Sequence, residues 1–541
     1  MKIKKQGVLY GSFLLLASVA ISRIAGLLLK IPLANILGGV GMGYYSSAYA
    51  VFMPIYALCA ASLPTALAQM VSQSDALGQR HRIFAVKEAA IKFFGGLGLL
   101  FTLIPLFGAK IISTHIVGNP EAWTSVAVIS LSIFLGTLTS IYRGLYEGLC
   151  DMTPTAVSQA VDSIVKLIAG LGLATIASKK GLGLPLVSSY AVAGTVVADF
   201  VGLLCLMLWK KERKPKPLPD QKELVVCELK RLLRLTAPIA LAGLVTSMVS
   251  AIDLSTIILL IKSSLKQNPW LYIEKYSDVL KSGIELKELP NFLYGSFTGL
   301  AFSIYTLIPS LCSVFGKSTF PKVSRLYAKN NKEAVSKEIR RCICICTYIA
   351  LPAGFGISLF SKQILNLLFS SKSAEVLVTA TPLAILALGT VFTAVSTACC
   401  FMLQAIGKQD TPVKITLASA VLKLILNTVL VPIPSLGLTG AAISTVVSGA
   451  FGCIWSVVSL YKLTNTKPKI LLSTVFPAVL GVFSCILAKF VYMNMPENRL
   501  NAWILLLFSV LIAIIAYALG TFLLDISTKN SVYAQFFEKK T

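Results

Sequence analysis

The sequence predicts an all-α, polytopic membrane protein with about 14 transmembrane helices. Of its 541 residues, 56% are hydrophobic and only 13% are charged, and the mean hydropathy is +0.79. A soluble chain of this length needs far more polar surface. Apolar segments of about twenty residues, the length that crosses a bilayer, recur along the whole chain. Together with an internal repeat described below, they predict two six-helix lobes and a C-terminal helix pair.

The predicted spans divide the chain at its basic linker. The spans of the first lobe are 8–30, 45–71, 89–107, 122–142, 154–177 and 186–208. Those of the second lobe are 235–261, 291–316, 342–360, 377–404, 413–432 and 437–461, and the final pair is 470–492 and 501–524. We therefore predict a first lobe at 1–209, a linker at 210–234, a second lobe at 235–461, and a terminal pair with its tail at 462–541.

The internal repeat is clearest around two lysines. Gly148–x5–Pro154–x11–Lys166 in the first half matches Gly407–x4–Pro412–x10–Lys423 in the second, and AVAGTVV at 191–197 matches AAISTVV at 441–447. Each lysine belongs to a polar stripe along one helical face. The stripes are Thr155, Gln159, Asp162 and Lys166, and then Thr416, Ser419, Lys423 and Asn427. Such a stripe favours a transporter whose site lies between two copies of one unit.

The net charge of +26 resides mainly in short loops between the apolar segments. That distribution follows the positive-inside rule, so it argues against nucleic acid as a partner and places both termini in the cytoplasm. The N-terminal stretch is interpreted as an uncleaved first transmembrane helix, because its apolar run continues past Arg23. With two histidines and twelve cysteines mostly inside apolar segments, no metal-ligand set is expected, and no cofactor.

Several charged residues fall at membrane depth. Arg23 is too deep in the first helix to reach a headgroup easily, so we expect it to face a cavity. Lys30, on the same face, either joins it or extends to the membrane surface. Lys166 either faces the cavity or is neutralised by Asp162 one turn earlier, whereas Lys423 has no acidic residue within one turn.

The remaining deep charges have two interpretations each. Asp199 and Asp253 either pair with a lysine or bind a coupling cation, and Arg143 with Glu147 forms either a cytoplasmic gate or a plain interfacial pair. The deep positions nevertheless have an excess of cations. An anion with spread charge, such as a diphosphate, therefore fits best, with Gln159 and Asn427 as polar contacts.

These segments resemble the multidrug/oligosaccharidyl-lipid/polysaccharide (MOP) exporter superfamily, and within it the stage V sporulation protein B and MurJ-type lipid II flippases. The similarity lies in SRIAGLLLKIPLANILGGVGMGYY at 22–45 and RGLYEGLCDMTPTAVSQ at 143–159. LQAIGKQDTPVK and LGLTGAAISTVV are similar to the second-half signatures. The resemblance implies two six-helix lobes around a cationic cavity, substrate-binding roles for Arg23 and Lys30, and a terminal helix pair that holds a polyprenyl tail.

The sequence departs from that pattern in two ways. Where the family has an acid and an arginine after the Ser-Gln motif, this chain has Asp162 and Lys166. The arginines that MurJ-type flippases carry in the second and eighth helices are absent from 51–71 and 291–316. These departures leave a teichoic-acid or capsule precursor open as the substrate beside lipid II.

The sequence thus predicts a flippase for an undecaprenyl-diphosphate-linked saccharide in the bacterial cell membrane, working by alternating access among membrane lipids. The alternative with the same fold is a cation-coupled antiporter related to multidrug exporters, although a cationic site suits cationic drugs poorly. A membrane glycosyltransferase is disfavoured because the acids of the external loop, Glu274, Asp278, Glu285 and Glu288, have no general-base or metal-binding companion. The protein is therefore not expected to be an enzyme.

Overall fold

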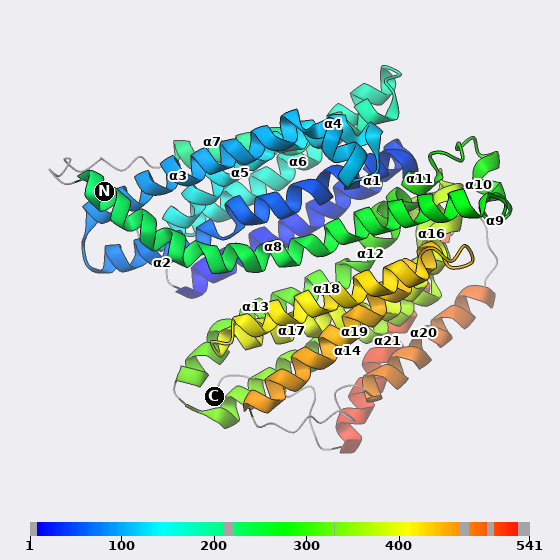
Figure 1. Cartoon of the computed structure of the whole chain (residues 1–541). Coiled ribbons are helices and arrows are strands. Elements are labelled where there is room, and N and C mark those ends of the chain that lie inside the picture. Colours follow the sequence, from blue (N-terminus) through cyan, green and yellow to red (C-terminus); the bar gives the residue numbers. More distant parts are fainter. Residues whose placement is uncertain (1–7, 210–220, 329, 465–474, 495–501, 529–541) are drawn as a thin grey trace. The chain divides into compact units, whose positions relative to one another are not determined.

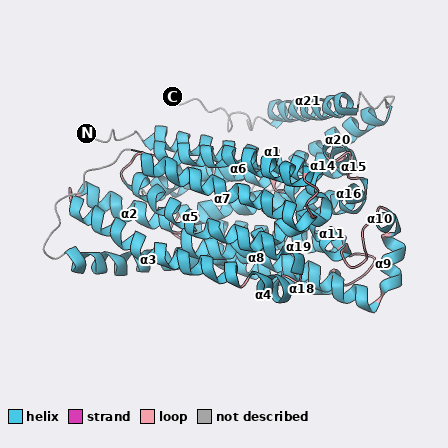
Figure 2. Ribbon diagram, turned by 90° about the horizontal axis from the view of Figure 1, so that it is seen from above, coloured by secondary structure: helices cyan, strands magenta, loops and turns pink. Residues whose placement is uncertain are grey.

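The protein is all-α. A computed structural model describes residues 8–209, 221–328, 330–464, 475–494 and 502–528 (Figure 1). None of these residues forms a strand, and the described segments are helices joined by loops (Figure 2). The predicted all-α fold class is therefore confirmed. The terminal lysines, including Lys539 and Lys540, and positions 210–220 of the predicted linker lie outside the described residues.

The helices form two compact units, Met1–Leu259 with Lys287–Gly299, and Leu260–Leu286 with Leu300–Thr541. Up to residue 267 the elements are α1 (Val8–Tyr56), η1 (Ala57–Ala61), α2 (Leu63–Ala76), α3 (Arg80–Phe107), α4 (Ala109–Ile111), η2 (Ile112–Ile116), η3 (Pro120–Ala122), α5 (Trp123–Gly148), α6 (Thr153–Lys179), α7 (Leu184–Leu208) and α8 (Gln221–Gln267). The following elements are α9 (Pro269–Lys275), α10 (Ser277–Lys281), α11 (Leu289–Ser296), η4 (Phe297–Ala301), α12 (Phe302–Tyr305), α13 (Leu307–Ala328), α14 (Lys332–Leu359), α15 (Ser361–Leu368), α16 (Ser373–Leu388), α17 (Thr390–Ala405), α18 (Asp410–Leu430), α19 (Leu438–Thr464), α20 (Phe476–Asn494) and α21 (Ala502–Thr528).

Ten of the described helical segments are long and apolar enough to cross a membrane, or up to twelve if each of two bent pairs is one span. The chain is therefore a multi-pass membrane protein, while the count of 14 stays a prediction. Two predicted spans, 8–30 and 45–71, fall in one helical stretch, and 235–261 lies in α8, which is not among the ten. At 49 residues α1 would extend about 74 Å if straight, more than twice a bilayer core. It is broken at Gly38, whose φ of 64° favours glycine.

Beyond that break, α1 packs backbone to backbone against α11 in the first unit. A Cβ on Gly295 would overlap the carbonyl oxygen of Gly39, so neither helix tolerates a larger residue there. Beside the contact, the buried Asn291 side chain donates to the Val40 carbonyl at 3.1 Å and accepts from Asn119 at 2.6 Å. In a lipid environment small residues of this kind allow helices to approach closely, and buried amides need partners of this kind.

The same close approach joins α6 to α7, and it follows the internal repeat. A Cβ on Gly194 would overlap the backbone of Gly170, the residue one turn after Lys166. In the second unit, the residue one turn after Lys423 is Asn427, and its side-chain oxygen accepts a hydrogen bond from Ser444. Gly194 and Ser444 hold the same place in the AVAGTVV and AAISTVV motifs. The repeated sequence therefore builds the same helix contact twice, with different side chains.

A second pair of contacts repeats in the same way. A Cβ on Gly202 would lie 3.5 Å from the Asp162 Cβ, and one on Gly452 would lie 2.7 Å from the Ser419 hydroxyl oxygen. Asp162 and Ser419 each precede their lysine by one turn, so the two faces correspond position by position. The acid of the first copy is thus replaced by a hydroxyl in the second.

The last part of the predicted linker is helical and packs onto the first unit. Residues 221–234 form the beginning of α8, where Glu228 is 1% exposed. Its carboxylate pairs with Arg82 at the start of α3 and lies 4.0 Å from Arg231. Leu232 is buried in the core formed by α2, α3 and α5. The predicted domain boundaries stay a prediction.

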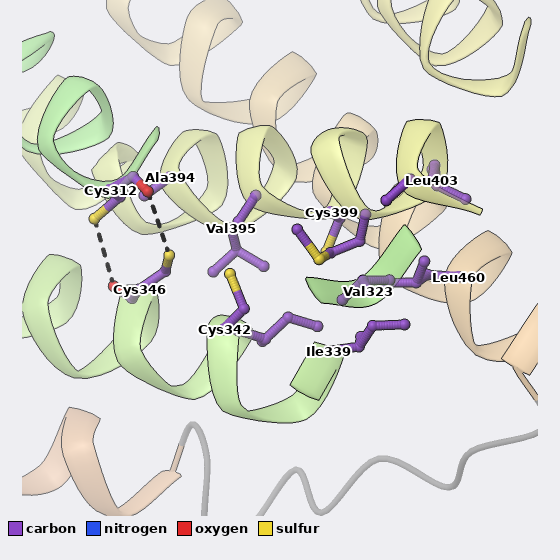
Figure 3. Packing of buried hydrophobic residues seen from close by; sticks show 14 of the residues in the cluster. Cys312, Val323, Ile339, Cys342, Cys346, Ala394, Val395, Cys399, Leu403 and Leu460 are labelled. Atoms are coloured by element: carbon purple, nitrogen blue, oxygen red, sulfur yellow. Dashed lines mark hydrogen bonds between the residues drawn. The ribbon is translucent and has the colours of Figure 1, made fainter. Parts of the chain in front are cut away.

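The core of the second unit contains several buried thiols among aliphatic side chains (Figure 3). Cys312 of α13 and Cys346 of α14 each direct their sulfur toward the other's carbonyl oxygen, at 3.9 and 3.8 Å. Cysteine behaves here as a small residue that lets two helices approach. All twelve cysteines are free thiols, and no described group of three or more histidine, cysteine or acidic residues is arranged to bind a metal.

We expect Gly194→Ala to destabilise the protein by about 1–3 kcal/mol, because the added methyl group must push α6 and α7 apart. Thermal unfolding of the purified protein in detergent measures the loss. Gly172→Ala, on the same helix pair but with no atom within 4 Å of the added carbon, is the control and should be neutral or slightly stabilising. Equal melting temperatures for the two variants would contradict the close contact.

Candidate functional site

Gln159 ties α6 to the first helix. The Ser18 hydroxyl donates to the Gln159 side-chain oxygen at 2.9 Å, and the Ser163 hydroxyl donates to the Ser22 hydroxyl at 2.6 Å. These contacts fix the face of α1 that carries Ser22 against the polar stripe of α6. The stripe predicted from the sequence is therefore partly used for helix packing.

Arg143 of α5 engages Asp162 of α6 across the helix interface. Its guanidinium lies 3.8 Å from the Asp162 carboxylate, and Nε donates to the Ser158 hydroxyl at 3.1 Å. The two side chains are 14% and 28% exposed, so the pair is largely shielded from solvent. The charged partner of Asp162 is thus Arg143 from the preceding helix, rather than Lys166 one turn along its own helix.

Lys166 lies over an aromatic ring. Its Nζ is 4.8 Å from the centre of the Tyr49 ring on α1, and among the described residues no carboxylate is within ion-pair distance of it. The carboxylates of Asp162 and Asp199 interact with Lys166 electrostatically, but from beyond ion-pair distance. The Tyr49 hydroxyl shares a 2.5 Å hydrogen bond with Thr195 of α7, which fixes the ring. Lys166 therefore keeps its positive charge available for an anion.

The two basic residues of the first helix differ in their surroundings. Lys30 is half-buried. Arg23 is exposed, and Gly26 between them has open space beside it. That Arg23 and Lys30 face a bound anion stays a prediction.

The other three residues predicted to gate or pair charges, Asp199, Glu147 and Asp253, lie on different helices. Asp199 of α7 lies near Ser132 and interacts electrostatically with Asp162, Lys166 and Arg143. Glu147 lies beside Thr155 and Arg143, near the junction of α5 and α6. Asp253 is on α8, and its side chain falls outside the described part of the structure.

In the second unit, Lys423 and Asn427 are both buried, at 4% and 0% exposed. Asn427 is fixed by Ser444 of α19, which is also buried. The position equivalent to Asp162 is Ser419, and the position equivalent to Asp199 is Gly449. The second copy thus retains the lysine and lacks both acids.

Sequence reasoning missed Tyr49, Thr195 and Ser444, which hold the predicted polar residues in place. Tyr49 belongs to an aromatic stripe of Tyr45, Tyr49, Phe52 and Tyr56, whose spacings of four, three and four place the rings on one face of α1. That spacing is also the one of ordinary helix packing, so it does not by itself indicate a contact with a lysine. Thr195 and Ser444 lie inside the two repeated motifs, so the repeat itself was a usable signal. In the first unit, Lys166 has no carboxylate within ion-pair distance among the described residues, so an anion could bind its ammonium group without displacing one.

A profile of the polysaccharide biosynthesis protein family matches residues 8–327, more than half of the chain. The chain belongs to this family. A second profile, lipid II flippase MurJ, matches residues 293–515. Both agree with the resemblance to the MOP exporters found in the motifs around Arg23 and Arg143.

Two relatives from Bacillus subtilis span nearly the whole chain. The lipid II flippase MurJ is 23% identical over 508 residues, 90% of this chain and 88% of its own. Stage V sporulation protein B is 22% identical over 512 residues, 92% of this chain and 93% of its own. Similarity to these two relatives thus covers 90% and 92% of the chain.

Solved structures share the fold. MurJ in an inward closed conformation matches with a TM-score of 0.69 at 15% identity, covering 94% of this chain and 98% of that one. An inward-facing multidrug resistance MATE transporter of the MOP superfamily matches with a TM-score of 0.64 at 17% identity, covering 84% and 100%. The polytopic family fold is therefore established. The names of these structures describe flippases and transporters, in agreement with the prediction that the chain is not an enzyme.

We expect Arg143→Gln to lower the free energy of unfolding by about 1–3 kcal/mol, because it leaves the shielded Asp162 carboxylate without its cation. Adding Asp162→Asn should recover much of the loss. Thermal melts of both single variants and the double variant give the coupling between the two residues. Additive losses would mean that the pair contributes no interaction energy.

Proposed function

We propose that the protein is a flippase that moves a polyprenyl-diphosphate-linked saccharide, with lipid II as the first candidate, from the inner to the outer leaflet by alternating access. The observation that carries the proposal is the Lys166 ammonium group, which lies 4.8 Å from the centre of the Tyr49 ring and, among the described residues, has no carboxylate within ion-pair distance. A cation at membrane depth without a close carboxylate favours an anionic ligand. A diphosphate headgroup supplies such an anion.

The proposed substrate contacts come from both repeats. Arg23 offers a planar fork to phosphate oxygens, and Lys30 and Lys166 act as point charges. Lys423 and Asn427 are the contacts contributed by the second repeat, and Gln159 lies on the same α6 stripe as Lys166. Arg143, Glu147 and Asp162 serve to pair charges near the junction of α5 and α6, and Asp199 and Asp253 are candidates for a coupling-ion site.

The proposal also sets location and topology. The proposed location is the bacterial cell membrane, and the excess of basic residues in alternate loops favours both termini in the cytoplasm. The similarity to the Bacillus flippase supports lipid II as cargo. The missing arginines at 51–71 and 291–316 favour a second candidate, a teichoic-acid or capsule precursor on the same lipid. A cation-coupled drug antiporter fits less well because the basic residues outnumber the acids.

The test is rescue of a bacterium depleted of its own lipid II flippase. We expect the wild-type chain to restore growth, and Arg23→Ala, Lys166→Gln and Lys423→Ala to fail, because each removes a cation assigned to the diphosphate. Lys92→Ala is the control, since Lys92 is exposed on α3 and pairs with Glu88 of its own helix. Immunoblots of membrane fractions test whether all variants are present in equal amounts.

The possible outcomes test the substrate assignment and the residue assignments separately. Failure of the wild type would exclude lipid II, and the same variants would then be assayed in a strain lacking its teichoic-acid precursor flippase. Rescue by the wild type together with all three variants would refute the residue assignments while leaving the transport function standing.

A further inference from the structure

We propose that Tyr49 is a positioning residue for the substrate diphosphate, because its ring holds the Lys166 ammonium in a defined place without neutralising it. This inference rests on the proposed function and specifies how one of its cations is kept available. Tyr49 does not touch the substrate. It acts through Lys166.

The ring of Tyr49 is fixed from several directions. Its hydroxyl shares a 2.5 Å hydrogen bond with Thr195 on α7, and its centroid lies 4.8 Å from that of Tyr45 and 6.2 Å from that of Phe52. Lys166 Nζ is 4.8 Å from the same centroid. A ring held in this way offers the lysine one face at a constant position, so the long side chain loses its freedom before the substrate arrives.

The close crossing of α6 and α7 accounts for the placement of these groups. Gly194 meets Gly170 backbone to backbone. Thr195 is the next residue along α7, and Lys166 is one turn before the contact on α6. This contact holds the main chains that carry Thr195 and Lys166 close together, and the Tyr49 ring from α1 contacts both residues, Thr195 through its hydroxyl and Lys166 through its face.

An aromatic partner has an advantage over a carboxylate here. A carboxylate within ion-pair distance would neutralise the lysine, and an incoming diphosphate would have to displace it. Asp162, the acid one turn earlier on the same helix, is instead engaged by Arg143 from α5. The face of a tyrosine ring attracts the ammonium group but carries no net charge. The N–H groups of the Lys166 ammonium can thus donate to phosphate oxygens without first displacing a carboxylate.

The experiment measures binding of undecaprenyl diphosphate to the full-length protein in nanodiscs, with uncharged undecaprenol as the comparator. Tyr49→Leu removes the ring, Tyr49→Phe keeps it, and Lys166→Gln removes the cation. We expect Tyr49→Leu to weaken diphosphate binding by about 3- to 30-fold, the range of a cation–π contact. Tyr49→Phe should stay much closer to the wild type, and undecaprenol binding should not change.

A double variant separates positioning from packing. If Tyr49 acts through Lys166, adding Tyr49→Leu to Lys166→Gln should cause no further loss, whereas a packing defect would add its own loss in either background. Tyr142→Leu is the matched control, because Lys87 lies over the Tyr142 ring at 5.0 Å elsewhere in the first unit. This control should leave diphosphate binding unchanged. Melting temperatures are recorded for every variant.

The results distinguish the inference from the function on which it rests. A wild type that does not prefer undecaprenyl diphosphate to undecaprenol would contradict the proposed function. A wild type with that preference, but with Tyr49→Leu binding equally well, or with Tyr49→Phe as weak as Tyr49→Leu, would overturn the role of the ring alone. Additive losses in the double variant would also overturn it.

Discussion

The ion pair between Arg143 and Asp162 determines how the other charges of the first unit are used. A carboxylate in an apolar helix bundle requires a cation nearby, and several bases of this unit lie within its reach. Because Arg143 of α5 takes that place, Lys166 is left to the ring of Tyr49, and its charge is not cancelled at close range. One ion pair between neighbouring helices thus decides which lysine of the first unit has no carboxylate at close range.

The two repeats show how a duplicated unit diverges while its packing is maintained. Both copies have a helix with a lysine, and in both the residue one turn after the lysine contacts the fourth position of the following motif. In the first copy the contact is glycine on glycine, and in the second it is an asparagine bonded to a serine. Where the first copy has Asp162 and Asp199, the second has Ser419 and Gly449. The backbone framework is thus shared, whereas the chemistry differs between the copies.

Much of this organisation follows from the sequence, since hydropathy, loop charge and repeat spacing act locally. They predicted an all-α membrane protein, the repeat and the deep bases. The partner of Asp162 was not predictable in the same way. An intrahelical spacing of four residues favours Lys166, whereas Arg143 comes near only through the packing of α5 on α6. Tyr49 was missed because its aromatic stripe with Tyr45 and Phe52 has the spacing of ordinary helix packing, which does not indicate a contact with a lysine of another helix. The number of spans was uncertain because Gly38 breaks α1 without any polar loop to mark a boundary.

The contact between Gly170 and Gly194 limits how this part of the molecule can be repaired after mutation. Where two main chains touch, a bulkier residue on one helix cannot be offset by trimming the other, because glycine has nothing left to remove. Asn427 and Ser444 meet through their side chains, so a change in one can be matched by a complementary change in its neighbour. Second-site suppressors should therefore arise readily at the α18–α19 contact. At the α6–α7 contact we expect only reversion to glycine to restore the packing.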